Sequence, residues 1–241
     1  MNLPEFRNRL GERLDTAFHP AAREDVIVLL GHGVTGNKDR PLLVALAEGL
    51  SARGWPCLRL SFAGNGQSEG RFEDVTITKE TEDLHDLIDA LPQGIRIAYC
   101  GHSMGAAVGT LTAASEPRVR VLVTIAGMVY TMNFVEREFD NITPGEGVMW
   151  DDPACPLSQE FVDDLDSIGD TLDIAREIEI PWLFLHGTAD DVIPVLDSED
   201  AHATTPAPKN LVEIEGGDHS FDETTYPALI EEIDAWLKEY L

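Results

Sequence analysis

The sequence predicts an α/β fold in which helices cover both faces of an eight-stranded, mostly parallel sheet. Three observations lead to this prediction. Short apolar runs alternate with helical patterns, several of these runs lack the polar alternation of a half-exposed strand, and glycines or prolines separate them. A chain of 241 residues is long enough for one such unit, so we expect a single domain over residues 1–241.

The expected strands begin with an N-terminal antiparallel hairpin. Its two arms, Phe6–Arg9 and Arg13–Phe18, flank the turn-like segment Leu10-Gly11-Glu12. The strands that follow are predominantly apolar runs bounded by turn residues, as expected for strands buried on both faces. They cover residues 25–30, 55–60, 95–100, 119–125, 181–186 and 210–215.

Helical spacing of apolar residues predicts the covering helices. These span residues 40–53, 77–91, 106–114, 195–202 and 226–240. Residues 128–177 interrupt the alternation with aromatic residues, prolines and acids. A connection of this length inside a compact domain usually serves a function. We therefore expect residues 128–177, called the lid segment below, to form a lid.

The composition excludes several classes of partner. The chain has 44 acidic and 17 basic residues, with a formal net charge of −27. Nucleic-acid binding needs a basic surface, and anionic membranes and polyanions are disfavoured for the same reason. No stretch approaches the roughly 20 apolar residues of a membrane span. The three scattered cysteines and the charged N-terminus predict a cytoplasmic protein without disulfides. The composition does not indicate an oligomeric state.

One short motif carries the chemistry. Gly101-His102-Ser103-Met104-Gly105 follows an expected strand and precedes an expected helix. In that context a G-x-S-x-G sequence forms a sharp turn that exposes the serine hydroxyl. Serine is a poor nucleophile at neutral pH and needs a base, which in turn needs an acid to orient it. Ser103 is therefore a candidate nucleophile that requires two partners.

The two partners are expected downstream of the serine. His219 is the best of the seven histidines, because it lies in a glycine-containing loop after the last expected strand. Residues 186–194 directly follow a strand, which brings their carboxylates to the edge of the sheet where sites of open α/β folds form. Asp190 and Asp191 both lie there, and we favour Asp190 as the acid.

Five motifs follow one another along the chain, at residues 32–38, 64–70, 101–105, 187–194 and 217–221. In these motifs and their order, the chain resembles the α/β-hydrolase superfamily along nearly its whole length. Within it, Phe72–Thr76 and the short lid are most similar to the branch of cinnamoyl/feruloyl-esterase-like and serine-aminopeptidase-like proteins.

The resemblance implies a role for each matching residue. Ser103 matches the nucleophile, Asp190 the acid and His219 the base. The backbone N–H groups of Val34 and Met104 match the two donors of the oxyanion hole, and no metal or organic cofactor is implied. One loop departs from the family, which usually has Asp-Phe-Arg-Gly-His-Gly where this chain has Ser-Phe-Ala-Gly-Asn-Gly.

The lid segment is expected to determine the substrate. Its acidic balance disfavours phosphorylated and CoA-linked molecules, so we expect a small-molecule ester with a neutral acyl or aromatic group. The reaction would be hydrolysis of that ester through an acyl-enzyme. Candidate substrate-binding side chains are the apolar and aromatic ones of this segment, Tyr130, Met132, Phe134, Met149 and Trp150.

Two alternative functions stay open. The first is a peptidase of the aminopeptidase-like branch, in which Glu136, Glu138 or Asp140 would hold the amine of a substrate. The second is a non-catalytic ligand-binding protein built on a hydrolase fold. Such proteins usually lose a member of the triad, whereas this chain keeps all three residue types.

Overall fold

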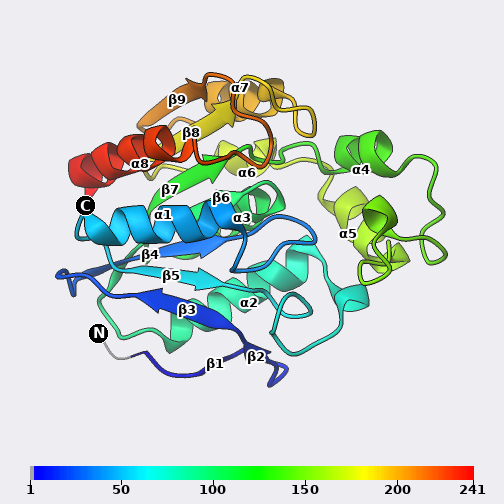
Figure 1. The fold of residues 1–241 in the computed structure, drawn as a ribbon, viewed down its shortest axis with the longest axis horizontal. Helices are drawn as coiled ribbons and strands as arrows, with labels where there is room; N and C mark the ends of the chain where they lie inside the picture. The colour runs from blue at the N-terminus through cyan, green and yellow to red at the C-terminus, as the bar shows by residue number, and fades with distance from the viewer. Residues whose placement is uncertain (1–2) are drawn as a thin grey trace.

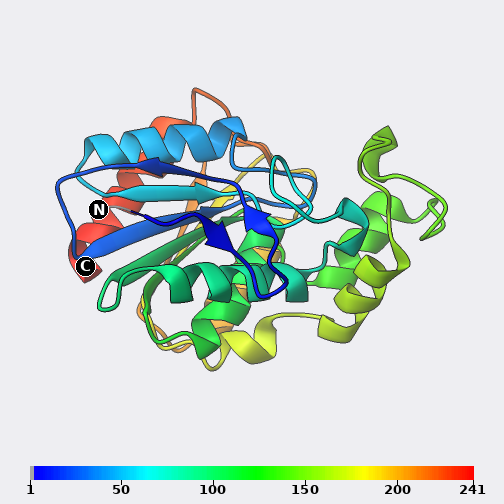
Figure 2. The same ribbon diagram turned by 90° about the horizontal axis from the view of Figure 1, so that it is seen from below.

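The computed structural model describes residues 3–241 and has a seven-stranded sheet between two layers of helices (Figures 1 and 2). The strand order is β3-β5-β4-β6-β7-β8-β9, and β3 alone runs antiparallel to its neighbour. The strands are β3 Thr16–His19, β4 Val26–Gly31, β5 Cys57–Leu60, β6 Arg96–His102, β7 Val119–Ile125, β8 Trp182–Gly187 and β9 Lys209–Ile214.

The central strands supply two separate apolar cores. Successive side chains of a strand point to opposite faces of the sheet. Val26, Val28 and Leu30 of β4 therefore face one core, and Ile27 and Leu29 face the other. This is the physical reason why these strands are apolar throughout and show no alternation in the sequence.

Each core is closed by its own helix layer. α1 (Pro41–Ala52) and α8 (Tyr226–Tyr240) lie side by side on one face (Figure 1). The other face carries α2 (Ile77–Ala90), α3 (Met104–Ser115), α6 (Leu172–Ala175) and α7 (Val195–Thr204). Within residues 3–241, none of the helices combines the length and hydrophobicity that crossing a bilayer requires.

The predicted fold class is confirmed. The prediction of eight strands exceeds the seven strands of the main sheet by one. The N-terminal segment divides into β1 (Phe6–Arg7) and β2 (Arg13–Leu14), which pair only with each other, and β3, which joins the main sheet. β1 stays apart because Phe6 is buried and the Asn8 side chain donates to Asp83 of α2, at 2.7 Å. These contacts hold the hairpin against α2 instead of at the sheet edge.

The lid segment lies between β7 and β8. Its helices α4 (Thr131–Phe139) and α5 (Gln159–Ile168) project beyond the sheet, together with the short helix η2 (Met149–Asp151) (Figures 1 and 2). A bridge between Tyr130 and Asp170 ties the two ends of the projection together. α6, which follows it, packs back on α3 and α7. A further short helix, η1, spans Phe72–Asp74.

The parallel register brings distant motifs to one edge of the sheet. Gly31 at the end of β4 is level with Gly101, and His102 at the end of β6 is level with Ile125 of β7. The loops that follow these strands, and the loop after Gly187 of β8, therefore emerge at the same edge as the lid segment. Carboxyl ends of parallel strands are where open α/β sheets place their sites.

Candidate active site

Ser103 occupies a strained turn between β6 and α3. Its φ of 56° is uncommon for a residue with a side chain. Two glycines make the turn possible. A Cβ on Gly101 would lie 2.2 Å from the carbonyl oxygen of Gly105, and a Cβ on Gly105 would lie 2.5 Å from that of His32. The G-x-S-x-G spacing is thus a steric requirement of the turn.

Ser103, His219 and Asp190 form one chain of hydrogen bonds. His219 Nε2 lies 3.0 Å from Ser103 Oγ, and His219 Nδ1 lies 2.9 Å from Asp190 Oδ2. With the ring proton on Nδ1, the imidazole donates to Asp190 and its free Nε2 accepts from the serine hydroxyl. These three residues are separated by up to 116 positions and meet only because their loops leave the same sheet edge.

Asp190 is the aspartate that contacts His219, whereas Asp191 is exposed. Burial by itself would raise the pKa of Asp190. Hydrogen bonds from His186 and His219, together with the N–H of Ile193, outweigh burial and hold the pKa well below its usual range. Asp190 Oδ1 also accepts from the N–H of Val192, at 2.9 Å. The carboxylate therefore stays ionised and fixed in position.

Val34 lines the same pocket as Ser103, and Met104 directly follows the serine in the chain. A Cβ on Gly33 would lie 2.7 Å from Ser103 Cβ, so the backbone leading into Val34 passes directly against the serine. Met104 is the first residue of α3, and the N–H at that position has no acceptor within its own helix. The positive end of the helix dipole lies at the same place. The start of α3 therefore offers a free backbone N–H and the positive end of the helix dipole next to Ser103.

A pocket of about 430 Å³ opens above Ser103. Among the predicted substrate-binding residues, Phe134 and Trp150 line it. Their rings form an edge-to-face cluster with Phe139, with centroids 4.9–6.2 Å apart. The lid segment therefore contributes an aromatic wall to the pocket.

The structure places three other predicted residues outside the lining of this pocket. The Tyr130 hydroxyl donates to Asp200 Oδ2 at 2.8 Å, on α7. Met149 is buried against Phe72, Val75 and neighbouring side chains, and Met132 packs on the same core cluster. The sequence indicated which apolar side chains the lid segment offers, but the direction of each one depends on how α4 and η2 pack.

Sequence reasoning missed the wall that comes from the starts of α1 and α8. Arg40, Pro41 and Leu42 line the pocket from α1, and Phe221 and Tyr226 line it from the region of α8. The one sequence signal for Arg40 was its position a few residues after the His32-Gly33 pair. This signal was weak, because nothing local shows that the side chain faces the pocket.

His102 supports the loop that carries His219. Its Nε2 lies 2.8 Å from the carbonyl oxygen of His219. Burial, followed by the charge of His219, lowers the pKa of His102 to about 3, so the ring is neutral and its Nε2–H donates to that carbonyl. The residue next to the serine therefore helps to fix the backbone of the histidine.

Comparison with known proteins identifies the family. The profile of the family described as serine aminopeptidase, S33, matches residues 22–143, just over half of the chain. This protein belongs to the serine aminopeptidase S33 family. Membership confirms the predicted α/β-hydrolase superfamily and makes the protein a hydrolase. The matched range includes the turn that carries Ser103 and the two glycine-containing motifs before it, at residues 32–38 and 64–70.

Two curated proteins are similar to much of this chain. YfhR of Salmonella typhimurium, an uncharacterized protein, is 28% identical over 219 residues, which cover 86% of this chain and 68% of YfhR. Mitochondrial palmitoyl-protein thioesterase ABHD10 of Bos taurus is 26% identical over 179 residues, covering 67% of this chain and 56% of ABHD10.

Solved structures share the fold of this S33 member. Est1E of Butyrivibrio proteoclasticus, solved with ferulic acid bound, superposes with a TM-score of 0.87 at 24% identity over 98% of each chain. Mouse α/β hydrolase domain-containing protein 10 gives a TM-score of 0.80 at 19% identity, over 97% of this chain and 98% of its own. At these identities the likeness concerns the fold.

Proposed function

We propose that this hydrolase is a serine esterase that cleaves carboxylic esters through an acyl-enzyme. The observation that carries the proposal is the position of His219, which bonds Ser103 Oγ on one side and Asp190 on the other. Both bonds have the length that proton transfer needs, 3.0 and 2.9 Å, and the serine opens into the pocket.

The mechanism follows from the contacts. His219 Nε2 takes the proton of Ser103 as Oγ attacks the ester carbonyl, and the N–H groups of Val34 and Met104 stabilise the oxyanion. Each such donor typically contributes about 3 kcal/mol to transition-state stabilisation. His219 then gives its proton to the leaving alcohol, and water releases the acid by the same route. These steps use no metal or organic cofactor.

The proposed substrates are esters with small neutral acyl or aromatic groups. The pocket of about 430 Å³ is within the size range of small-molecule sites, and Phe134 and Trp150 offer aromatic surface. The ferulic acid bound to the structural neighbour Est1E is an aromatic acid. We further propose that the protein acts in the cytoplasm, because Cys57, Cys100 and Cys155 are all free and buried.

Replacing the nucleophile tests the proposal. Ser103→Ala should lower kcat/KM for 4-nitrophenyl butyrate by about 10³-fold or more, and it should abolish labelling by a fluorophosphonate. Ser115→Ala, at an exposed position at the end of α3, is the matched control and should retain wild-type turnover. Turnover of the Ser103 variant within about tenfold of wild type would contradict the mechanism.

The family description also makes a peptidase a candidate. In that case lid carboxylates would hold the substrate's amine, yet none of Glu136, Glu138 and Asp140 is among the described lining residues of the pocket. Glu138 instead accepts from Trp150 Nε1 at 3.1 Å. An aminoacyl-nitroanilide should therefore be a much poorer substrate than 4-nitrophenyl butyrate. The reverse preference would favour the peptidase.

A further inference from the structure

The pocket above Ser103 has an unusual charge for this protein. Acidic residues make up 44 of the 241 residues, yet no aspartate or glutamate is found among the described residues that line the pocket. Arg40 is the one lysine or arginine in that lining. The pocket lining thus carries one permanent cation and no carboxylate, within a strongly negative protein.

Arg40 has no carboxylate partner within residues 3–241. The recorded hydrogen bonds of its guanidinium come from Nη2, which lies 3.1 Å from the carbonyl oxygen of Thr35 and 3.5 Å from its hydroxyl. The nearby acid Asp39 is occupied elsewhere. Its Oδ2 pairs with Lys38 at 2.6 Å and its Oδ1 with Arg59 at 2.9 Å. The first turn of α1, which follows Arg40, also carries no acid.

We propose that Arg40 determines specificity by binding a carboxylate of the substrate, so that the ester cleaved at Ser103 carries a second, acidic group. This inference rests on the proposed esterase function and changes the substrate class from wholly neutral esters to esters that also carry a carboxylate. The neutral or aromatic part would occupy the pocket beside Phe134 and Trp150, and the acidic part would reach Arg40.

The geometry suits this role. A guanidinium presents its N–H groups as a planar fork that matches a carboxylate, and the bond to Thr35 holds one branch in place. Thr35 directly follows Val34, so Arg40 is anchored to the segment that faces the carbonyl under attack. A negative protein repels an anionic substrate at long range, and a cation inside the pocket offsets this repulsion where binding occurs.

Two pairs of matched esters test the proposal, because the acidic group can belong to the acyl part or to the alcohol. Monoethyl adipate is compared with ethyl hexanoate, and 4-carboxyphenyl butyrate with 4-carbamoylphenyl butyrate. For each pair the ratio of kcat/KM, acidic over neutral, is measured with the wild type and with Arg40→Gln, Arg40→Lys and Arg120→Gln. Arg120 is an exposed arginine of β7 outside this pocket, and its variant controls for the change in net charge.

The expected result is a ratio that falls about tenfold in Arg40→Gln for at least one pair, and less in Arg40→Lys. The effect is modest because the Arg40 guanidinium remains exposed to water. The Arg120→Gln ratio should equal that of the wild type. Ratios that change less than about twofold in Arg40→Gln for both pairs would overturn the proposal while leaving the esterase function intact.

A binding measurement decides the proposal without any turnover. Calorimetric titration with 4-nitrobenzoate and 4-nitrobenzamide should show that Arg40→Gln weakens the benzoate about tenfold relative to the benzamide. Equal affinities of the benzoate for wild type and Arg40→Gln would overturn the proposal. If no ester is cleaved, the esterase function fails, and this titration still decides the role of Arg40.

Discussion

Two groups of buried carboxylates in this molecule behave in opposite ways. Asp190, after β8, has its pKa held well below the usual range. Glu80 and Asp83, both on α2, have theirs raised. All three side chains are almost completely removed from water, so burial alone cannot explain the difference.

The donors around each carboxylate account for it. Asp190 receives two backbone N–H groups, from Val192 and Ile193, and lies within hydrogen-bond or ion-pair distance of His186 and His219. Hydrogen bonds to the charged form of an acid favour ionisation strongly enough to overcome burial. The loop after β8 is therefore built to keep one negative charge in place.

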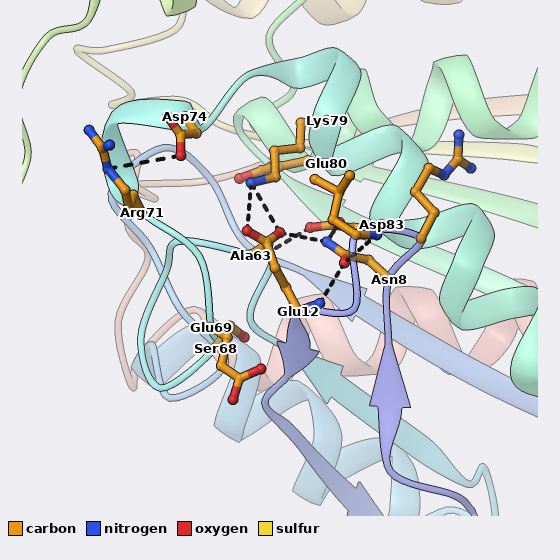
Figure 3. A network of polar contacts seen from close by, with 12 residues as sticks. Asn8, Glu12, Ala63, Ser68, Glu69, Arg71, Asp74, Lys79, Glu80 and Asp83 are labelled. Carbon is orange, nitrogen blue, oxygen red and sulfur yellow. Dashed lines mark hydrogen bonds and ion pairs between the residues drawn. The ribbon is translucent and has the colours of Figure 1, made fainter.

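Each carboxylate of the α2 pair receives fewer donors than Asp190 does, and Figure 3 shows the contacts of Asp83 with Asn8 and Ala63. Asp83 accepts from Ala63 N–H and Asn8 Nδ2, but burial still raises its pKa to about 6. Burial, and then the charge of Asp83, raises the pKa of Glu80 well above its usual range. Glu80 Oε1 accepts from Asn65 at 3.3 Å, and Oε2 has no partner recorded within residues 3–241.

The comparison separates the proposed catalytic use of one buried acid from the structural use of two others. At Asp190 the donors converge on a charge that His219 needs. At Glu80 and Asp83 the acids connect three segments, namely the N-terminal hairpin, the loop at Ala63–Asn65 and α2. A proton on Glu80 or Asp83 leaves acceptor oxygens for the contacts with these three segments. A proton on Asp190 would instead remove the negative charge beside His219.

The largest expected effect comes from replacing Asp190, the carboxylate that contacts His219. Asp190→Asn should lower kcat/KM for 4-nitrophenyl butyrate by about 10³-fold or more, because an amide can donate to His219 Nδ1 and stabilise the wrong tautomer. Asp191→Asn, at the exposed neighbour, is the matched control and should stay close to wild type. A loss of less than about tenfold in Asp190→Asn would show that the ionised carboxylate is not needed.

The next effect concerns the connection made by Asn8. Its Nδ2 donates to Asp83 and to Glu12, each at 2.7 Å, and its Oδ1 accepts from the N–H of Leu10 and Glu12. Asn8→Ala should lower the free energy of unfolding by about 2–3 kcal/mol, because buried groups lose their partners. Urea unfolding measures this.

An exposed asparagine provides the comparison for that variant. Asn210→Ala, on β9, should change the free energy of unfolding by less than about 0.5 kcal/mol. If Asn8→Ala is no more destabilising than Asn210→Ala, the hairpin is held by Phe6 and its apolar contacts alone.

The smallest effect tests the direction of the pKa shift at Glu80. A carboxyl group whose folded pKa is raised contributes stability below its unfolded pKa and loses it as the pH rises through the folded value. Glu80→Gln cannot ionise, so it should be more stable than the wild type by about 1 kcal/mol at pH 8 and nearly equal to it at pH 4. Urea unfolding at both pH values tests this.

The matched control is Glu231→Gln, at an exposed position of α8, whose effect on stability should not differ between the two pH values. A Glu80→Gln variant less stable than the wild type at pH 8 would mean that the ionised carboxylate is well solvated or paired. Asp190 has the opposite sign, since its depressed pKa contributes stability that is lost only as the pH falls.

Much of the fold could be predicted because its signals are local. The run at residues 25–30 became β4 (Val26–Gly31), and the helical spacing at 77–91 became α2 (Ile77–Ala90). Apolar runs and 3.6-residue spacing report burial along a short stretch of chain, which one element by itself satisfies. The serine turn is local too, since its glycines are required within five residues.

The features that failed or were missed depend on contacts between distant residues. The first arm of the hairpin left the main sheet because Asn8 reaches Asp83, 75 positions away. Met132 and Phe134 lie on the same helix and are both apolar, yet only Phe134 lines the pocket. No pattern near Glu80 indicated a raised pKa, since that shift comes from the elements packed around it.

The sequence by itself therefore determined the order of strands and helices, the serine turn and the types of residue available for catalysis. Only the tertiary structure decided that Asp190 and not Asp191 contacts His219, and that Arg40 faces the pocket without a carboxylate partner within residues 3–241. The physical reason is distance along the chain. Local patterns encode which side chains are buried, whereas hydrogen bonds and charge pairs depend on which buried surfaces meet.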